Sequence, residues 1–180
     1  MQLAYSKSSA RGFSMIELLV AVLVMGIGVL GIAGLQMVSL QNNRGALERA
    51  EAVQLAYNVL DRVRSNPGTG VVPGANYAPV NIAGAPPAFV DCQAANCTSA
   101  QMVNYDLAIW KCSLGGWDTD QACLDARAAG AVWPATLQPG LPNGDGAIAV
   151  NNATGIITVT VQWQPPNTAN PLTITIDSQG

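Results

Sequence analysis

The hydropathy of the chain is uneven, and its most apolar stretch lies close to the N-terminus. The eighteen residues from Leu18 to Leu35 include no charged or strongly polar side chain. As an α-helix this run would be about 27 Å long, close to the ~30 Å hydrocarbon core of a bilayer. The pattern therefore predicts a helix that is long enough to cross a membrane once.

The helix is predicted to continue well beyond the apolar run. Residues 36–65 contain no proline and a single glycine, and their apolar residues recur at helical spacing. The predicted inner stripe consists of Leu47, Ala50, Val53, Ala56, Tyr57, Leu60 and Val63. The predicted polar face consists of Glu48, Arg49, Glu51, Gln54, Asn58, Asp61, Arg62 and Arg64. Because Asn66-Pro67-Gly68 is a strong stop signal, we expect one helix from about Phe13 to Ser65.

Further along the chain the pattern changes from helical to alternating. Two short helices are expected at 106–111, capped by Asp106 or Asn104, and at 118–129, ended by Gly130. Three strands are expected at Ile148–Val150, Ile156–Trp163 and Leu172–Ile176. An antiparallel sheet of these strands can cover the inner stripe of the long helix with its apolar face. The predicted fold class is therefore α+β.

Composition argues against several functions. The chain has no histidine, which removes the commonest general base and the commonest zinc ligand. It has no nucleophile motif, P-loop or Gly-x-Gly-x-x-Gly, and the Asp118-x-Asp120 and Asn143-x-Asp145 fragments lack the full spacing of a calcium loop. With a net charge of −3 and no basic patch, nucleic acid is not an expected partner. We expect neither enzyme activity nor a cofactor.

Four cysteines, Cys92, Cys97, Cys112 and Cys123, stand in the middle of the chain. In an oxidising compartment an even number predicts two disulfides, and three connectivities are open. Pairing of sequence neighbours is the simplest of the three. A zinc site is disfavoured, because Cys112 and Cys123 are too far apart for the usual spacing of ligand pairs.

A single carboxylate, Glu17, lies at the start of the apolar run, just after a leader that carries Lys7 and Arg11. An ionised group at such a position costs about 2.5–3.5 kcal/mol unless it is paired, so Glu17 implies a partner. A secretory signal peptide would have a shorter apolar region, about 7–15 residues, and a small-residue cleavage site after it. A plain membrane anchor accounts for the basic leader by the positive-inside rule but leaves Glu17 unexplained.

The stretch Gly12-Phe13-Ser14-Met15-Ile16-Glu17, followed by the apolar run, resembles the class III leader of type IV pilins and type II secretion pseudopilins. The resemblance implies that a prepilin peptidase cuts after Gly12 and that Phe13 becomes the methylated N-terminus. It also implies the type IV pilin fold, in which the C-terminal half of a long helix packs on a small antiparallel sheet. Glu17 would pair with the Phe13 ammonium of another subunit, since opposite charges attract strongly in apolar surroundings.

Four later segments resemble the PilV type of minor pilin: Leu60–Pro67, Asp106–Trp110, Leu141–Gly146 and Val159–Trp163. This resemblance implies a subunit that starts in the inner membrane, with its head in the periplasm, and then joins a pilus on the cell surface. It would prime assembly or lie near the tip, and so support adhesion or twitching motility. The implied partners are the prepilin peptidase, the inner-membrane assembly platform, the major pilin, other minor pilins and a tip adhesin.

The resemblance also divides the chain into segments. These are a cleaved leader at 1–12, a membrane or filament-core half of the helix at 13–40, an amphipathic half at 41–65 and a head at 66–180. Two alternatives stay open at this point. One is a type II secretion pseudopilin, which has a similar helix. The other is a membrane-tethered periplasmic binding domain, which would not be cut after Gly12.

Overall fold

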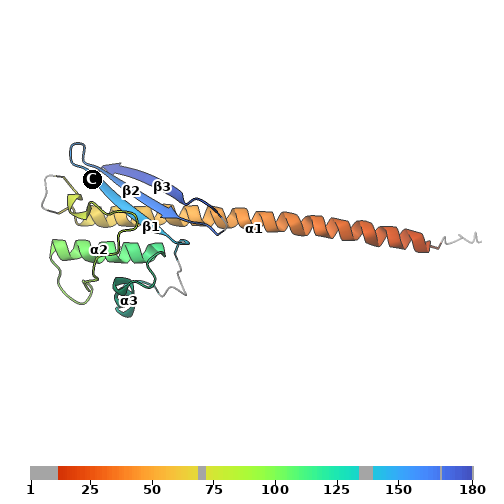
Figure 1. Cartoon of the computed structure of the whole chain (residues 1–180), viewed down its shortest axis with the longest axis horizontal. Coiled ribbons are helices and arrows are strands. Elements are labelled where there is room, and N and C mark those ends of the chain that lie inside the picture. The colour runs from red at the N-terminus through yellow and green to blue at the C-terminus, as the bar shows by residue number, and fades with distance from the viewer. Residues whose placement is uncertain (1–11, 69–71, 134–139, 167, 180) are drawn as a thin grey trace, which may run out of the picture. The chain divides into compact units, whose positions relative to one another are not determined.

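The computed structural model describes residues 12–68, 72–133, 140–166 and 168–179. In chain order its elements are α1 (Met15–Ser65), the 3₁₀ helix η1 (Ala75–Tyr77), α2 (Ser99–Leu114), α3 (Gln121–Ala128), β1 (Asp145–Asn151), β2 (Ile156–Trp163) and β3 (Leu172–Gln179) (Figure 1). One long helix combined with a three-stranded antiparallel sheet confirms the predicted α+β class and the predicted single helix. The chain forms two compact units, one ending at Arg44 and one beginning at Gly45.

In the first unit, α1 has no core of its own. Every described side chain from Gly12 to Arg44 is exposed, and the first buried residue of α1 is Glu48. The second unit contains the hydrophobic core. Its α1 segment contributes Ala52, Leu55, Ala56, Val59, Leu60 and Val63.

The sheet and α2 complete this core. The three strands are antiparallel in the order β1-β2-β3, and Ile148 of β1 also forms an isolated bridge with Val80. Along β2 every second side chain is buried, as the alternating pattern predicted. These inward side chains are Ile157, Val159, Val161 and Trp163, and they meet Val103, Leu107, Trp110 and Leu114 of α2. Figure 1 shows the sheet and α2 beside the part of α1 that belongs to this unit, with α3 next to α2.

The face of α1 that packs in the core differs from the predicted one. Leu47, Val53 and Tyr57 of the predicted stripe are 70%, 39% and 50% exposed, whereas Glu48 of the predicted polar face is only 8% exposed. Ala52 and Ala56 are fully buried, and their small side chains let neighbouring elements pack closely against α1. The buried face of α1 is therefore the face that carries these alanines, and not the face that carries the largest apolar side chains. The prediction of the inner stripe was therefore wrong in its first half and right at Ala56, Leu60 and Val63.

The two short helices also differ in their bounds. Thr98 forms a capping box with Gln101, so α2 begins at Ser99, seven residues before the Asp106 at which a helix was predicted. Asp106 is consequently not a cap but a buried residue in mid-helix. The second helix lies where it was expected, with Asp120 as its N-cap. Its chain then turns at Gly130, whose φ is +73°.

Candidate functional site

The Gly12–Phe13 peptide lies just outside the first turn of α1. Phe13 is 80% exposed, and no atom lies within 4 Å of the position that a Cβ on Gly12 would occupy. The helix begins two residues later at Met15. A peptide bond that lies outside the helix, exposed and free of packing, can enter the active site of a protease without any unfolding of α1. The basic leader with Lys7 and Arg11 lies outside the described residues.

Glu17 stands in the first turn of α1. Its backbone N–H donates to the carbonyl oxygen of Ser14 over 3.0 Å, and its carboxylate is close to the positive end of the helix dipole. The side chain is exposed, and no described residue of the chain offers it an ion pair or hydrogen bond. The exposed Glu17 carboxylate is therefore accessible to a positively charged group of another molecule.

The surface around and after Glu17 is almost entirely apolar. Large side chains from Phe13 to Leu40 expose between 55% and 82% of their area. Contiguous apolar surface on this scale is not stable in water and marks contact with lipid or with other proteins. The helix is long and apolar enough to cross a membrane, judged by length and composition. Its exposed surface therefore needs lipid or the apolar helices of other chains.

Gly26, Gly28, Gly31 and Gly34 interrupt this surface. Nothing in the described chain lies within 4 Å of a Cβ added at any of them. Their small size is therefore not required by packing inside the chain. Close approach by a second helix and local unwinding during assembly both remain explanations for them.

In the second unit, a buried ion pair joins α2 to the start of β1. The Lys111 side chain is fully buried, and its Nζ donates to Asp145 Oδ1 over 2.5 Å and to the carbonyl oxygen of Asn81 over 2.9 Å. Asp145 also accepts from the Trp117 indole and from the backbone N–H of Ala83 and of its own neighbour Gly146. Burial alone would raise the pKa of Asp145, but these hydrogen bonds outweigh it and hold the pKa below its ordinary value.

A second polar network joins α1, η1 and α2. Asp106 accepts from the Tyr77 hydroxyl over 2.6 Å and from Arg62 Nη1 over 2.8 Å. Asn66 donates to the Tyr77 oxygen and to the carbonyl oxygen of Ser99. Burial of the phenol, followed by its bond to Asp106, raises the pKa of Tyr77 far above its ordinary value. Both networks are satisfied internally, so they hold the head together and are not reactive sites.

All four cysteines form disulfides. Cys92 pairs with Cys97 in the loop before α2, and Cys112 pairs with Cys123, which joins α2 to α3. This is the pairing of sequence neighbours, one of the three connectivities that the sequence left open. Within the described ranges no group of three or more His, Cys, Asp or Glu side chains is placed to hold a metal ion.

Sequence reasoning missed the residues that attach the sheet and α2 to α1. The Trp163 indole donates to Glu48, and the Trp110 indole donates to the carbonyl oxygen of Leu55 over 3.0 Å. Hydropathy carries no signal for either bond, because each joins an indole to an acceptor far away in the sequence. Trp110 and Trp163 are buried, at 1% exposure each, whereas Trp133 is 65% exposed.

The fold and the N-terminal geometry together define a type IV pilin architecture, which is a structural and not an enzymatic class. Comparison with family models agrees. A model described as type IV pilin Tt1218 matches residues 34–108, and the prokaryotic N-terminal methylation motif matches residues 7–33. The two matched segments adjoin, so the part of the chain that is similar to the type IV pilin model directly follows the part that is similar to the methylation motif. No curated protein and no solved structure matches the chain.

These matches support a pilin role. A prepilin motif followed by an apolar helix indicates a chain that is anchored in a membrane and then incorporated into a pilus. Proteins with these features are in general processed by a prepilin peptidase and assemble with other pilins.

Proposed function

We propose that the protein is a minor pilin of a type IV pilus, cut after Gly12 and methylated at Phe13. The observation that carries the proposal is the exposed Gly12–Phe13 peptide directly before the first part of α1, in which every apolar side chain as far as Leu40 is exposed. The chain starts in the inner membrane with its head in the periplasm. It then joins other minor pilins in a complex that primes assembly or lies at the tip.

Glu17 sets the register of assembly in this proposal. Cleavage creates an α-amino group at Phe13 with an ordinary pKa of about 7.7–8, so it is mostly cationic at neutral pH. Glu17 lies four positions after this ammonium in the sequence, and both residues are exposed at the apolar N-terminal end of the chain's long helix. The Glu17 carboxylate of one subunit then pairs with the Phe13 ammonium of another. A lone charge buried among apolar helices would be strongly destabilising, so only a register that makes this pair is favoured.

Mass spectrometry of filaments sheared from cells tests the processing. We expect an N-terminal peptide that starts at methylated Phe13, at low abundance beside a major pilin. An intact Met1, or a cut at any other residue, would overturn the proposal. Processed protein that is absent from filaments, together with failed enzyme export in a deletion strain that still makes pili, would assign the chain to the type II secretion pseudopilins.

A pair of variants in the first turn tests the role of Glu17. We expect Glu17→Ala to be cleaved and methylated normally but to stay in the inner membrane. Ser14→Ala changes the neighbouring turn without changing charge and should enter filaments at the level of the unmodified protein. Equal incorporation of Glu17→Ala and Ser14→Ala would show that Glu17 has no part in assembly.

A further inference from the structure

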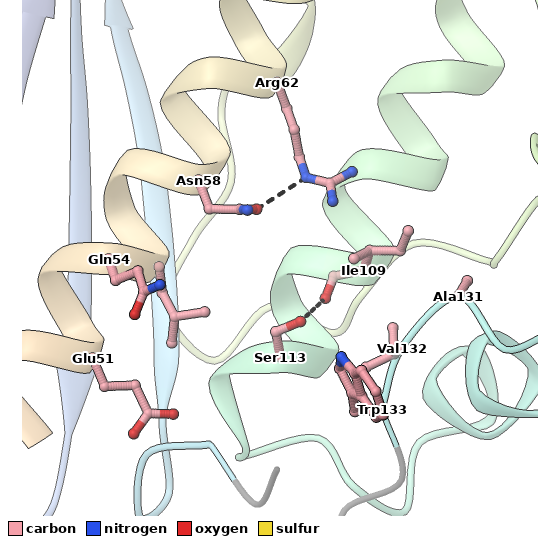
Figure 2. Close-up of a pocket in the computed structure, with 10 residues that line it drawn as sticks. Glu51, Gln54, Asn58, Arg62, Ile109, Ser113, Ala131, Val132 and Trp133 are labelled. Carbon is pink, nitrogen blue, oxygen red and sulfur yellow. Dashed lines mark hydrogen bonds between the residues drawn. The ribbon is translucent and has the colours of Figure 1, made fainter.

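A hollow of about 280 Å³ lies on the head between α1, α2 and the chain that follows α3. Figure 2 shows its walls: α1 contributes Glu51, Gln54, Asn58 and Arg62, α2 contributes Ile109 and Ser113, and the third wall is formed by Ala131, Val132 and Trp133. The buried Leu55 completes the lining. The hollow lies entirely within the second compact unit.

Its most unusual component is Trp133. The side chain is 65% exposed, although the other tryptophans of the chain each donate their indole N–H to an acceptor on another element. Burying an aromatic ring of this size is normally favourable, so leaving it on the surface of a small head loses stability. An exposed indole beside a polar hollow is typical of a residue that is covered only when a partner binds.

The charge in the hollow is negative. Arg62 donates from Nη1 to Asp106 Oδ1 over 2.8 Å and from Nε to Asn58 Oδ1 over 3.0 Å. The Asp106 carboxylate therefore already balances its positive charge. Glu51 is partly buried, and no described side chain donates a hydrogen bond to it or forms an ion pair with it. Burial, and then the nearby charge of Glu48, raise the pKa of Glu51 above its ordinary value. A cation bound here would offset both the burial of the Glu51 carboxylate and its repulsion by Glu48.

We propose that this hollow binds an arginine side chain of a partner protein, with its guanidinium between the Trp133 ring and the Glu51 carboxylate. A guanidinium is planar, stacks on aromatic faces and binds carboxylates through two parallel N–H groups, which a lysine ammonium cannot do. Gln54 supplies an amide oxygen on the same wall, and Ile109 and Val132 provide apolar surface for the aliphatic stem.

The identity of the partner rests on the proposed function, under which it is a neighbouring pilus subunit. The binding of a guanidinium by Trp133 and Glu51 does not depend on the proposed function, so a small arginine compound can test the site by itself. If arginine binds but the chain never enters filaments, the proposed function fails and the site stands. If filaments form but arginine does not bind, the site fails and the proposed function stands.

The test is a titration of the full chain in detergent with N-acetyl-arginine methylamide, followed by NMR of the indole N–H signals. The signal that disappears in Trp133→Phe identifies Trp133. We expect this signal alone to shift with the arginine compound and to shift far less with the matched citrulline compound, which is planar and uncharged. Equal shifts with both compounds, or no shift, would overturn the proposal, as would an equal response to a methyl glucoside.

Two variants separate the site from general folding. Glu51→Gln keeps the shape of the side chain and should weaken arginine binding by about tenfold through loss of one charge-assisted contact. Asp125→Asn removes a charge on α3 that does not line the hollow and should bind as the unmodified chain does. The signals of Trp110, Trp117 and Trp163 report that each variant is folded. Unchanged binding by a folded Glu51→Gln would contradict the proposal.

Discussion

The indole Nε1 of Trp163 donates a hydrogen bond to Glu48 Oε2 over 3.2 Å, in surroundings where both residues are buried. Trp163 is the last residue of β2 and Glu48 is the first buried residue of α1, so the bond attaches the sheet to the helix close to Gly45, where the second unit begins. A carboxylate is tolerated at this point of the core because an N–H group is aimed at it. The polar contact fixes where along α1 the sheet lies.

Trp163→Phe should lower the free energy of unfolding by about 1–3 kcal/mol, because it removes a donor from a buried carboxylate and leaves a small void. Trp133→Phe is the matched control, since the same substitution at a 65% exposed ring should change stability little. Denaturant titrations of the two variants followed by circular dichroism would check this. Equal losses would mean that the Trp163–Glu48 bond contributes nothing.

Lys111→Met should lower the free energy of unfolding by about 3–5 kcal/mol, because Asp145 would stay buried without its counter-charge. The methionine fills a similar volume, so a loss of this size would not come from a cavity. Arg49→Met makes the same chemical change at an exposed position of α1 and should have almost no effect. Thermal unfolding of both variants measures the difference, and a Lys111→Met chain as stable as the control would contradict the role of the ion pair.

Asp145 should also make stability depend on pH. Its pKa in the folded chain lies below the ordinary value of 3.8, so its contribution is complete above pH 3.8 and is lost as the pH falls through the folded pKa. The stability difference between the unmodified chain and Asp145→Asn should therefore be constant from neutral pH down to about 4 and shrink below it. Denaturant titrations over this range would reveal it; a difference that does not change with pH would refute the assignment.

Glycine-to-alanine substitution should have opposite effects at two positions. A Cβ on Gly144 would overlap the carbonyl oxygen of Leu114 and lie 2.8 Å from Leu141, so Gly144→Ala should severely destabilise the head. Gly45 lies within α1 with nothing within 4 Å, so Gly45→Ala should stabilise the helix by about 1 kcal/mol. A Gly144→Ala chain that melts at or above the temperature of the unmodified chain would show that the close approach at Gly144 is not restrictive.

A fragment that begins at Gly45 should be soluble and folded without detergent. All buried residues of the described core lie beyond this point, whereas the exposed large apolar side chains are concentrated before it. We expect the fragment to give dispersed NMR signals and to keep both disulfides. Aggregation of the fragment, with a well-dispersed spectrum for the full chain in detergent, would show that the first unit is needed for the head to fold.

Much of this architecture could be predicted because it depends on local patterns. The alternation from Ile156 to Trp163 indicates a strand with one buried face, and Asn66-Pro67-Gly68 ends α1 as expected. The processing site after Gly12 is proposed from the same kind of local signal, a motif of a few residues before an uncharged run, and it stays a prediction.

The remainder depended on contacts between distant segments. Glu48 appeared to belong to the solvent face of a helix, whereas the indole of Trp163, 115 residues later, donates a hydrogen bond that favours its burial. Lys111 and Asp106 are buried for the same reason, since their partners come from β1, η1 and α1. Such partners are not visible in hydropathy, which treats each charged residue as a surface residue.

The turn between β1 and β2 is held by hydrogen bonds within itself, in which Asn151 accepts from the backbone N–H groups of Ala153, Thr154 and Gly155. Residues 152–154 are exposed, and a Cβ at Gly155 would meet no atom within 4 Å. A short epitope inserted between Asn152 and Ala153 would therefore extend into solvent and leave the core unchanged. Cells that carry such a tag would allow individual molecules to be located and counted along a filament by fluorescence microscopy.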